Sequence, residues 1–431
     1  MPKCGPVLKC LLAALAGAVT LTLTGCSTPC DVRLCAPIIP NTSAPPAPPE
    51  PQYAPPPPPP EIESIRTVPI DAPDAPDSPA APQDRAPPPA GGRVTHLGLI
   101  LPLRSAGLAA PADALRAGFM AAFERDKSGF ELQIIETGDN PQETLDAYQR
   151  ALVDNDIIIG PLSRSAVGAL ANSPLVKKPT IALNHPEVRG RPLPPQMLII
   201  GLSIEDEAKQ VAEWAADEHP AGPALVVTGA SAWQRRIASS FTARFKQLGH
   251  EVQTVELAGS NGYLSEAALS QLRGQLGASP PALVFTALDP SQAGQVRAAL
   301  GANDPASSGL PFYGTSSVNP GADPTTTIPD LVGMRMLDLP WEVQPSHPAA
   351  MVYPRWSGNG QALDMDRLYA LGIDAFRVAR EISLREGGSF DLDGVTGKLR
   401  IDFGRGPARF ERVQPAAVYQ GGGFSLINGQ Q

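Results

Sequence analysis

The residues that could perform chemistry are few and scattered along this chain of 431 residues. Its five histidines show no spacing that is typical of a metal site. The sequence contains no Gly-x-Ser-x-Gly nucleophile turn and no Gly-x-x-x-x-Gly-Lys phosphate loop. Its carboxylates form no recognisable pair for general acid–base work. We therefore predict that the chain is not an enzyme and that it uses no metal or cofactor.

The best candidate for a small-molecule site is the turn Gly160-Pro161-Leu162-Ser163-Arg164-Ser165. It leads from an apolar strand into a helix, so its amides would face a cleft and attract an anion. Ser163, with Ser165 beside it, could hold a carboxylate, or Ser163 could simply be the N-cap of the helix. Asn184 and Asp374 are the other candidates for this cleft, although Asp374 could equally be a solvated or structural acid.

Two further groups of residues are candidates for a partner surface. Trp341 and Trp356 lie in a proline-rich stretch, where aromatic side chains can anchor an interface or simply pack locally. Arg189 and Arg191 lie in the loop 186–195, which is the other candidate surface.

The composition separates a globular part from a segment that cannot form a core. The formal net charge is −9 and there is no basic block, which argues against nucleic acid as a partner. Of the 50 prolines, 21 lie between residues 36 and 92. Proline removes the backbone donor that helices and sheets need, so we predict a disordered, extended tether. At about 3.1 Å per residue, residues 27–92 would span up to roughly 200 Å.

The first residues have the features of an export signal. A short basic start precedes an apolar run of 13 residues, 11–23, which is shorter than the roughly 20 residues of a membrane-spanning helix. The run ends in Leu23-Thr24-Gly25-Cys26, which resembles the lipobox of bacterial lipoproteins. The resemblance implies a signal peptide at 1–25 and a lipid anchor on Cys26, whose thiol and new amino group would be acylated.

The residue after that cysteine bears on localisation. The family's signal for retention in the inner membrane is an aspartate, and here Ser27 occupies that position. The resemblance therefore implies the periplasmic face of the outer membrane. Cys30 and Cys35 could form a small disulfide or remain free.

Residues 94–430 alternate between apolar strand patterns and amphipathic helix patterns, which favours parallel sheets covered by helices. There are too many units for one sheet of ordinary width, so we predict an α/β protein with two lobes. Two hairpin signals follow near the end. They are centred on Gly404-Arg405-Gly406-Pro407 and on Gly421-Gly422-Gly423.

This order of elements resembles the type I periplasmic-binding-protein fold, in which the chain crosses between two lobes three times. The resemblance implies crossings near Gly201–Ile204, Leu339–Trp341 and Leu392–Thr396. The first lobe would then contain about residues 94–200 and 342–391. The second would contain about residues 201–338 and 395–430.

Within that superfamily the chain resembles the LppC family of outer-membrane lipoproteins. The matching stretches are Leu97-Gly98-Leu99-Ile100-Leu101-Pro102-Leu103, Ile158-Ile159-Gly160-Pro161-Leu162, Ile181-Ala182-Leu183-Asn184, Gly201-Leu202-Ser203 with Glu205-Asp206-Glu207-Ala208, Asp338-Leu339-Pro340-Trp341, Leu368-Tyr369-Ala370-Leu371-Gly372-Ile373-Asp374-Ala375-Phe376 and Gly394-Val395-Thr396-Gly397.

The LppC resemblance implies a non-catalytic protein that binds and activates a bifunctional penicillin-binding protein, a peptidoglycan synthase. The best-known member of the family carries a large helical-repeat domain where this chain has the proline-rich tether. The alternative is a lipid-anchored receptor for a small polar solute such as an amino acid. Asn184-His185-Pro186 weakens that alternative, because these residues would crowd an amino-acid pocket.

Overall fold

The computed structural model describes residues 94–187, 192–260, 262–278, 280–301, 309–321, 328–357, 363–385 and 387–427. These residues form two α/β lobes, each built on its own sheet, and a small third sheet. The predicted class, α/β with parallel sheets, is confirmed. The predicted signal peptide, lipid anchor and tether lie outside the described residues.

The first lobe contains a five-stranded parallel sheet in the order β2-β1-β3-β4-β5. Its strands are β1 (Thr95–Leu101), β2 (Phe130–Glu136), β3 (Ile157–Ile159), β4 (Thr180–Ala182) and β5 (Met197–Ile199). The central strand, β3, consists of three buried isoleucines, as expected for a parallel strand covered on both faces.

Alternate residues of these strands contact helices on opposite faces of the sheet. Leu97, Leu99 and Leu101 of β1 pack with the helices α1 and α9, whereas Ile100 packs with α2 and α3. This alternation follows from the two-residue repeat of a β-strand. The helices are α1 (Ala109–Asp126), α2 (Pro141–Asp154), α3 (Arg164–Ala171) and α9 (Leu363–Leu384).

Helices α1 and α9 cross at two glycines. A Cβ atom on Gly118 would lie 1.9 Å from the carbonyl oxygen of Tyr369, and one on Gly372 would lie 2.0 Å from that of Leu115. The missing side chains therefore allow the two backbones to touch. Around this crossing, the rings of Phe119, Phe123 and Phe130 pack edge to face against Phe376, at centroid distances from 5.5 to 5.9 Å.

The second lobe contains a seven-stranded sheet in the order β17-β16-β12-β11-β10-β6-β7. Five of its strands are parallel, and β16 and β17 join the edge next to β12 in antiparallel fashion. The strands are β6 (Ala224–Thr228), β7 (Val252–Glu256), β10 (Leu283–Ala287), β11 (Phe312–Gly314), β12 (Arg335–Leu337), β16 (Ala416–Tyr419) and β17 (Phe424–Leu426).

Helices cover both faces of this second sheet. One face packs with α4 (Ile204–Glu218) and α5 (Ala232–Gln247), and the other with α6 (Glu266–Ala278) and α7 (Pro290–Ala299). Polar side chains begin several of these helices by accepting a backbone N–H, as N-caps do. These caps are Ser203 of α4, Ser231 of α5 and Asp289 of α7. The shorter elements are a β8–β9 pair (Gly259–Ser260 and Tyr263–Leu264), η1 (Ser316–Val318), η3 (Pro329–Leu331) and α8 (Pro340–Val343).

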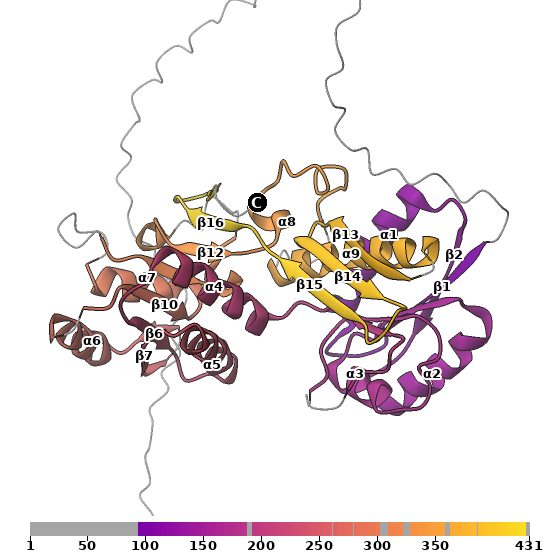
Figure 1. Cartoon of the computed structure of the whole chain (residues 1–431), viewed down its shortest axis with the longest axis horizontal. Helices are drawn as coiled ribbons and strands as arrows, with labels where there is room; N and C mark the ends of the chain where they lie inside the picture. Colours follow the sequence, from indigo (N-terminus) through magenta and orange to yellow (C-terminus); the bar gives the residue numbers. More distant parts are fainter. Residues whose placement is uncertain are drawn as a thin grey trace, which may run out of the picture. The chain divides into compact units, whose positions relative to one another are not determined.

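The third sheet is antiparallel and belongs to the first lobe. It consists of β13 (Gly388–Asp393), β14 (Lys398–Phe403) and β15 (Arg409–Val413) (Figure 1). Phe390, Leu399 and Ile401 on its inner face are buried in the same core as α1 and α9. The chain therefore returns to the second lobe only after β15, near Gln414. The predicted third crossing near Leu392–Thr396 is wrong, because the apolar side chains of β13 and β14 hold this segment on the first lobe.

The predicted helices and strands lie close to those observed, including both C-terminal hairpins. The sequence did not reveal β13, α8 or the β8–β9 pair. Strand β13 begins at Gly388, and only Phe390 of its six residues is buried. Its sequence therefore carries little apolar signal.

Candidate functional site

Three chain segments connect the two lobes, and together they form a polar joint. They are residues 200–203 after β5, residues 338–341 after β12, and residues 414–415 between β15 and β16. We refer to these segments and the side chains that bind them as the joint. The first two segments lie where the sequence predicted crossings.

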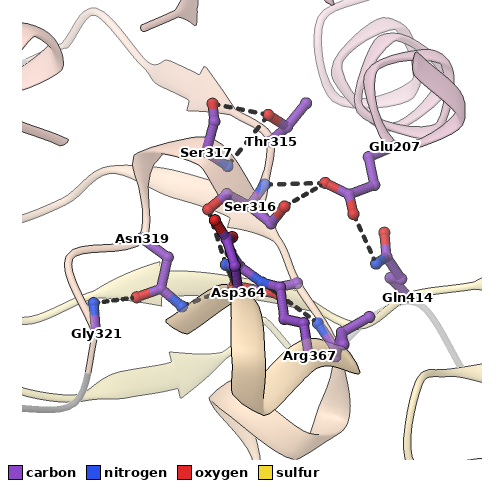
Figure 2. A network of polar contacts seen from close by, with 11 residues as sticks. Glu207, Thr315, Ser316, Ser317, Asn319, Gly321, Asp364, Arg367 and Gln414 are labelled. Atoms are coloured by element: carbon purple, nitrogen blue, oxygen red, sulfur yellow. Dashed lines mark hydrogen bonds and ion pairs between the residues drawn. The ribbon is translucent and has the colours of Figure 1, made fainter. Parts of the chain in front are cut away.

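The second crossing is held by an ion pair between the fully buried Asp338 and the largely buried Arg367. Arg367, near the start of α9, donates from Nη2 to Oδ2 of Asp338 at 2.7 Å and from Nε to Oδ1 at 3.3 Å. Its Nη2 also donates to the carbonyl oxygen of Ser316 at 3.0 Å (Figure 2). Asp338 is fully buried, and it also accepts a bond from Asn319 at 2.7 Å. The guanidinium of Arg367, in the first lobe, thus binds two chain segments that follow strands of the second lobe.

The third crossing is held from α4 by Glu207. Oε1 of this buried carboxylate accepts a hydrogen bond from Nε2 of Gln414 at 3.1 Å. Oε2 accepts from the backbone N–H and the hydroxyl of Ser316, at 3.1 and 2.6 Å (Figure 2). Burial, and then the nearby carboxylate of Asp338, raise the pKa of Glu207. Glu207 therefore joins the third crossing to the Ser316 turn that Arg367 also binds.

The first crossing is held from β15 by Arg412. Its Nη2 donates to the carbonyl oxygen of Ile200 at 2.7 Å, and its Nη1 donates to that of Gly201 at 3.2 Å. Its Nε donates to the hydroxyl of Thr396 at 3.0 Å. Burial lowers the pKa of Arg412 to about 10, so the guanidinium remains charged at neutral pH.

Asp374 is a structural acid of the same region. It is fully buried on α9, and its Oδ2 accepts from the N–H and the hydroxyl of Thr396 at 2.8 and 2.7 Å. Its Oδ1 accepts from the N–H of Val395 at 3.1 Å. These bonds hold the turn that binds Arg412. The suggestion that Asp374 faces a ligand cleft is therefore wrong, because its oxygens are occupied inside the protein.

Each crossing is bound by an ionisable side chain from another part of the chain. Arg412 binds the first crossing, Arg367 the second and Glu207 the third. Removing one partner of a buried ion pair typically costs about 3–5 kcal/mol, because the other charge is left without compensation. The arrangement is suited to holding two lobes in a fixed relation.

A second acid lies beside the joint. Burial raises the pKa of Glu342 on α8 to about 8, with a further contribution from the carboxylate of Asp338. Its Oε1 has no hydrogen-bond partner among the residues that the structure describes. A protonated, neutral carboxyl group is consistent with this surrounding.

A groove of about 660 Å³ opens next to the joint. Its walls come from α4, from the start of β14 and from β15, and the first crossing contributes Gly201 and Ser203. Arg412, Glu207 and Gln414 of the joint also line it. The groove is therefore continuous with the residues that connect the lobes.

The predicted small-molecule turn is formed, and its residues bond to one another. Ser163 is the N-cap of α3 and accepts the N–H of Ala166 at 3.2 Å, while its hydroxyl lies 3.4 Å from that of Ser165. Asn184 donates to the carbonyl oxygen of Leu162 at 3.1 Å and accepts from the N–H of His185. The structure thus brings Ser163, Ser165 and Asn184 together. None of the three lines the groove.

The two predicted aromatic anchors differ in position. Trp341 is fully buried, its ring lies 5.5 Å from that of Tyr369, and Arg355 covers its face at 4.2 Å. The suggestion that Trp341 contacts a partner is therefore wrong, because the side chain packs within the first lobe. Trp356 is half-buried, with its ring 5.7 Å from Tyr369. Arg189 and Arg191 lie outside the described residues.

The charged residues of the joint were not predicted from the sequence. Glu207 and Asp338 belong to stretches that matched a family pattern, but no role was assigned to them. Arg367 and Arg412 gave no signal, because an arginine in a helix or an alternating strand ordinarily faces water. Only the fold shows that these four side chains all lie at the crossings.

The described residues show neither a membrane-spanning helix nor a metal-binding cluster. None of the helices in the described ranges has the length and apolar character needed to cross a membrane. The same residues contain no group of three or more His, Cys, Asp and Glu side chains placed to hold a metal ion.

Two parallel-sheet lobes joined by three crossings define a protein of the type I periplasmic-binding-protein class. A solved structure described as a "putative branched-chain amino acid ABC transporter" from Chromobacterium violaceum has a TM-score of 0.62 and 32% identity, covering 75% of this chain and all of that one. The C-domain of LpoA from Haemophilus influenzae, described as a regulator of PBP1A, has a TM-score of 0.60 and 22% identity, covering 77% of this chain and all of that domain.

The chain belongs to the LppC family, as its sequence predicted. The family model described as "LppC putative lipoprotein" matches residues 91–410. The penicillin-binding protein activator LpoA of Enterobacter sp. (strain 638) is 27% identical over 308 residues, which cover 63% of this chain. That match spans only 41% of the relative's length.

Proposed function

We propose that this chain is an outer-membrane lipoprotein, anchored through Cys26, that binds a bifunctional peptidoglycan synthase and stimulates it without catalysing a reaction. The observation that carries the proposal is the LppC match over residues 91–410, together with relatives named as penicillin-binding protein activators. The lipobox-like Leu23-Thr24-Gly25-Cys26 supports the anchor. Two or more acyl chains would hold the protein stably on a membrane, where one would not.

The joint supports an action by contact. Glu207, Arg367 and Arg412 are used to hold chain segments, which fits a body of constant shape that another protein can recognise. Activation requires that this body bind the active state of the synthase more tightly than the inactive state. A preference of about 100-fold would correspond to about 2.7 kcal/mol.

The direct test combines the purified chain with a bifunctional penicillin-binding protein from the same bacterium. We expect the two proteins to bind, and the rates of glycan polymerisation or peptide crosslinking to rise when the chain is added. The chain denatured by heat is the control for nonspecific effects. Absence of both binding and stimulation, with a synthase that is active by itself, would remove the proposal.

A second candidate function is a lipid-anchored receptor for a small polar solute. It is favoured by the 32% identity to the Chromobacterium violaceum structure, whose description names a branched-chain amino acid transporter. Ser163, Ser165 and Asn184 would then bind the ligand from the carboxyl ends of β3 and β4. A thermal-shift screen with amino acids tests this candidate, because a ligand at 100 times its Kd stabilises the folded state by about 2.7 kcal/mol. A shift that is lost in Ser163→Ala but kept in the exposed control Ser239→Ala would support it, and a silent screen would exclude it for amino acids.

A further inference from the structure

The two walls of the groove beside the joint differ in charge. Helix α4 of the second lobe lines one wall with four carboxylates and a lysine, which are Asp206, Glu207, Glu213, Asp217 and Lys209. Strands β14 and β15 of the first lobe line the other wall with two cations and one carboxylate, which are Lys398, Arg412 and Glu411. Negative charge therefore predominates on the wall from α4, and positive charge on the wall from the third sheet.

Most of these charges already have partners within the protein. Asp206 binds a lysine one turn further along α4 at 2.6 Å, and Glu213 binds an arginine of α5 at 2.7 Å. Arg412 is bound to the carbonyl oxygens of the first crossing. Lys398 and Asp217 are both exposed, and neither forms an ion pair in the part of the chain that the structure describes. The groove thus offers an unpaired ammonium on one wall and an unpaired carboxylate on the other.

The strand register gives the separation of these two charges along the groove. Lys398 pairs with Val413 in the ladder of β14 and β15. The next residue, Gln414, donates its N–H to Oε1 of Gln210 on α4 at 3.2 Å. Lys398 therefore lies near the level of Gln210, and from Gln210 to Asp217 the helix rises by about 10 Å. An extended peptide covers that length with about three residues.

The groove also contains a buried hydrogen-bond acceptor. Gln414 lines the groove and is only 3% exposed. Its Nε2 donates to Glu207 at 3.1 Å, which fixes the amide, whereas its Oε1 has no partner among the described residues. Buried polar atoms in folded proteins nearly always have a partner. A ligand with an N–H group, such as the backbone of a peptide, would supply one.

We propose that this groove is a binding site for a short zwitterionic peptide of about three residues. The ammonium group of the peptide faces Asp217, its carboxylate faces Lys398, and a backbone N–H donates to Oε1 of Gln414. The groove volume of about 660 Å³ lies within the range of about 300–1,000 Å³ that is typical of ligand sites. The bound peptide contacts both lobes and the joint, so it stabilises one relation of the lobes over others. The inference is independent of the proposed function, because it involves neither the lipid anchor nor the synthase.

Four forms of one tripeptide test the two charges separately. Titration calorimetry of the full chain compares trialanine that has free ends with its acetylated, amidated and doubly blocked forms. We expect each single block to raise the Kd about fivefold and the double block to raise it further, because each removes one charged contact. Dialanine should also bind more weakly than trialanine, since two extended residues span only about 7 Å.

Substitutions at the two ends of the site should give a crossed pattern. Asp217→Asn should weaken the binding of trialanine about fivefold but leave that of the acetylated form unchanged, because this form has no ammonium group. Lys398→Gln should weaken the binding of trialanine but leave that of the amidated form unchanged. A general structural defect would weaken all forms. Asp154→Asn and Lys177→Gln change exposed residues of the same types outside the groove, and they should alter the Kd by less than about twofold.

Three outcomes would overturn the proposal. The first is a Kd that is the same for the free and the blocked peptides. The second is the absence of any heat from trialanine at concentrations up to about 10 mM, which is weaker than the usual range of specific binding. The third is binding that is lost in Ser163→Ala but unchanged in both groove variants, which would place the peptide at the Ser163 turn and support the receptor function. None of these outcomes changes the test of synthase binding, which is measured separately.

Discussion

The close crossing of α1 and α9 predicts that even an alanine at Gly118 or Gly372 lowers the stability of the protein. In Gly118→Ala, the new Cβ would lie 1.9 Å from the carbonyl oxygen of Tyr369 and 2.7 Å from its carbonyl carbon. In Gly372→Ala, it would lie 2.0 Å from the carbonyl oxygen of Leu115. Both obstacles are backbone atoms of a packed helix, so no side chain can rotate away.

The magnitude follows from two opposing effects. Alanine favours a helix over glycine by about 1 kcal/mol. Relief of the contact requires the helices to separate by about 1.3 Å, given an ordinary carbon–oxygen contact of about 3.2 Å. Such overpacking costs about 1–3 kcal/mol, and more where the backbone itself must move. With a cost at the upper end of that range, we expect a net loss of about 2 kcal/mol. Because unfolding a part that spans residues 94–427 has an entropy of about 0.7 kcal/mol/K, this corresponds to about 3 °C in Tm.

Urea and thermal unfolding of the purified chain measure this effect, and Gly274→Ala in α6 is the matched control. A Cβ at Gly274 would meet no atom within 4 Å, so the same substitution should stabilise the protein by up to about 1 kcal/mol. A lower stability in Gly118→Ala together with a higher stability in Gly274→Ala would confirm the reasoning. An unchanged or raised Tm in Gly118→Ala would refute it, because the backbone contact would then not limit the packing of the two helices.

Three further outcomes follow from the structure and the proposal. Arg367→Ala should lower the free energy of unfolding by about 3–5 kcal/mol in urea titrations, because it leaves the buried Asp338 unpaired, and a loss below 1 kcal/mol would contradict the ion pair. Glu342 has a folded-state pKa of about 8, above its ordinary value, so the stability it contributes at low pH should decline as pH rises toward 8. Glu342→Gln should flatten the stability–pH curve in that window, and an unchanged slope would argue against a neutral carboxyl there. Cys26→Ala should move the chain from membrane to soluble fractions and remove the acyl mass from its N-terminal peptide, whereas membrane retention would show another anchor.

The sequence was sufficient for the fold where residue patterns repeat. The buried strand 157–159 and the stripe of α9 that contains Leu371 and Ala375 each follow a simple period, so their secondary structure could be predicted. The third sheet could not be assigned correctly to a lobe. The alternation of apolar and polar residues shows which face of a strand is buried, but it does not show which of the two cores that face packs against.

The candidate site was harder to predict for a related reason. Arg412 lies in Arg-Phe-Glu-Arg-Val, where two arginines occupy alternating positions and only the tertiary structure shows that Arg412 reaches the first crossing. Trp341 and Asp374 each had two interpretations from the sequence, an exposed or ligand-facing role and a structural one. The structure places both in the interior.

The joint also determines how the chain can be divided. A fragment that ends before α4 would retain the carbonyl oxygens of Ile200 and Gly201 without the guanidinium of Arg412. A fragment that contains only the second lobe would bury Asp338 without Arg367. Neither lobe should therefore fold well in isolation, and shortened versions for biochemical work should keep residues 94–427 together.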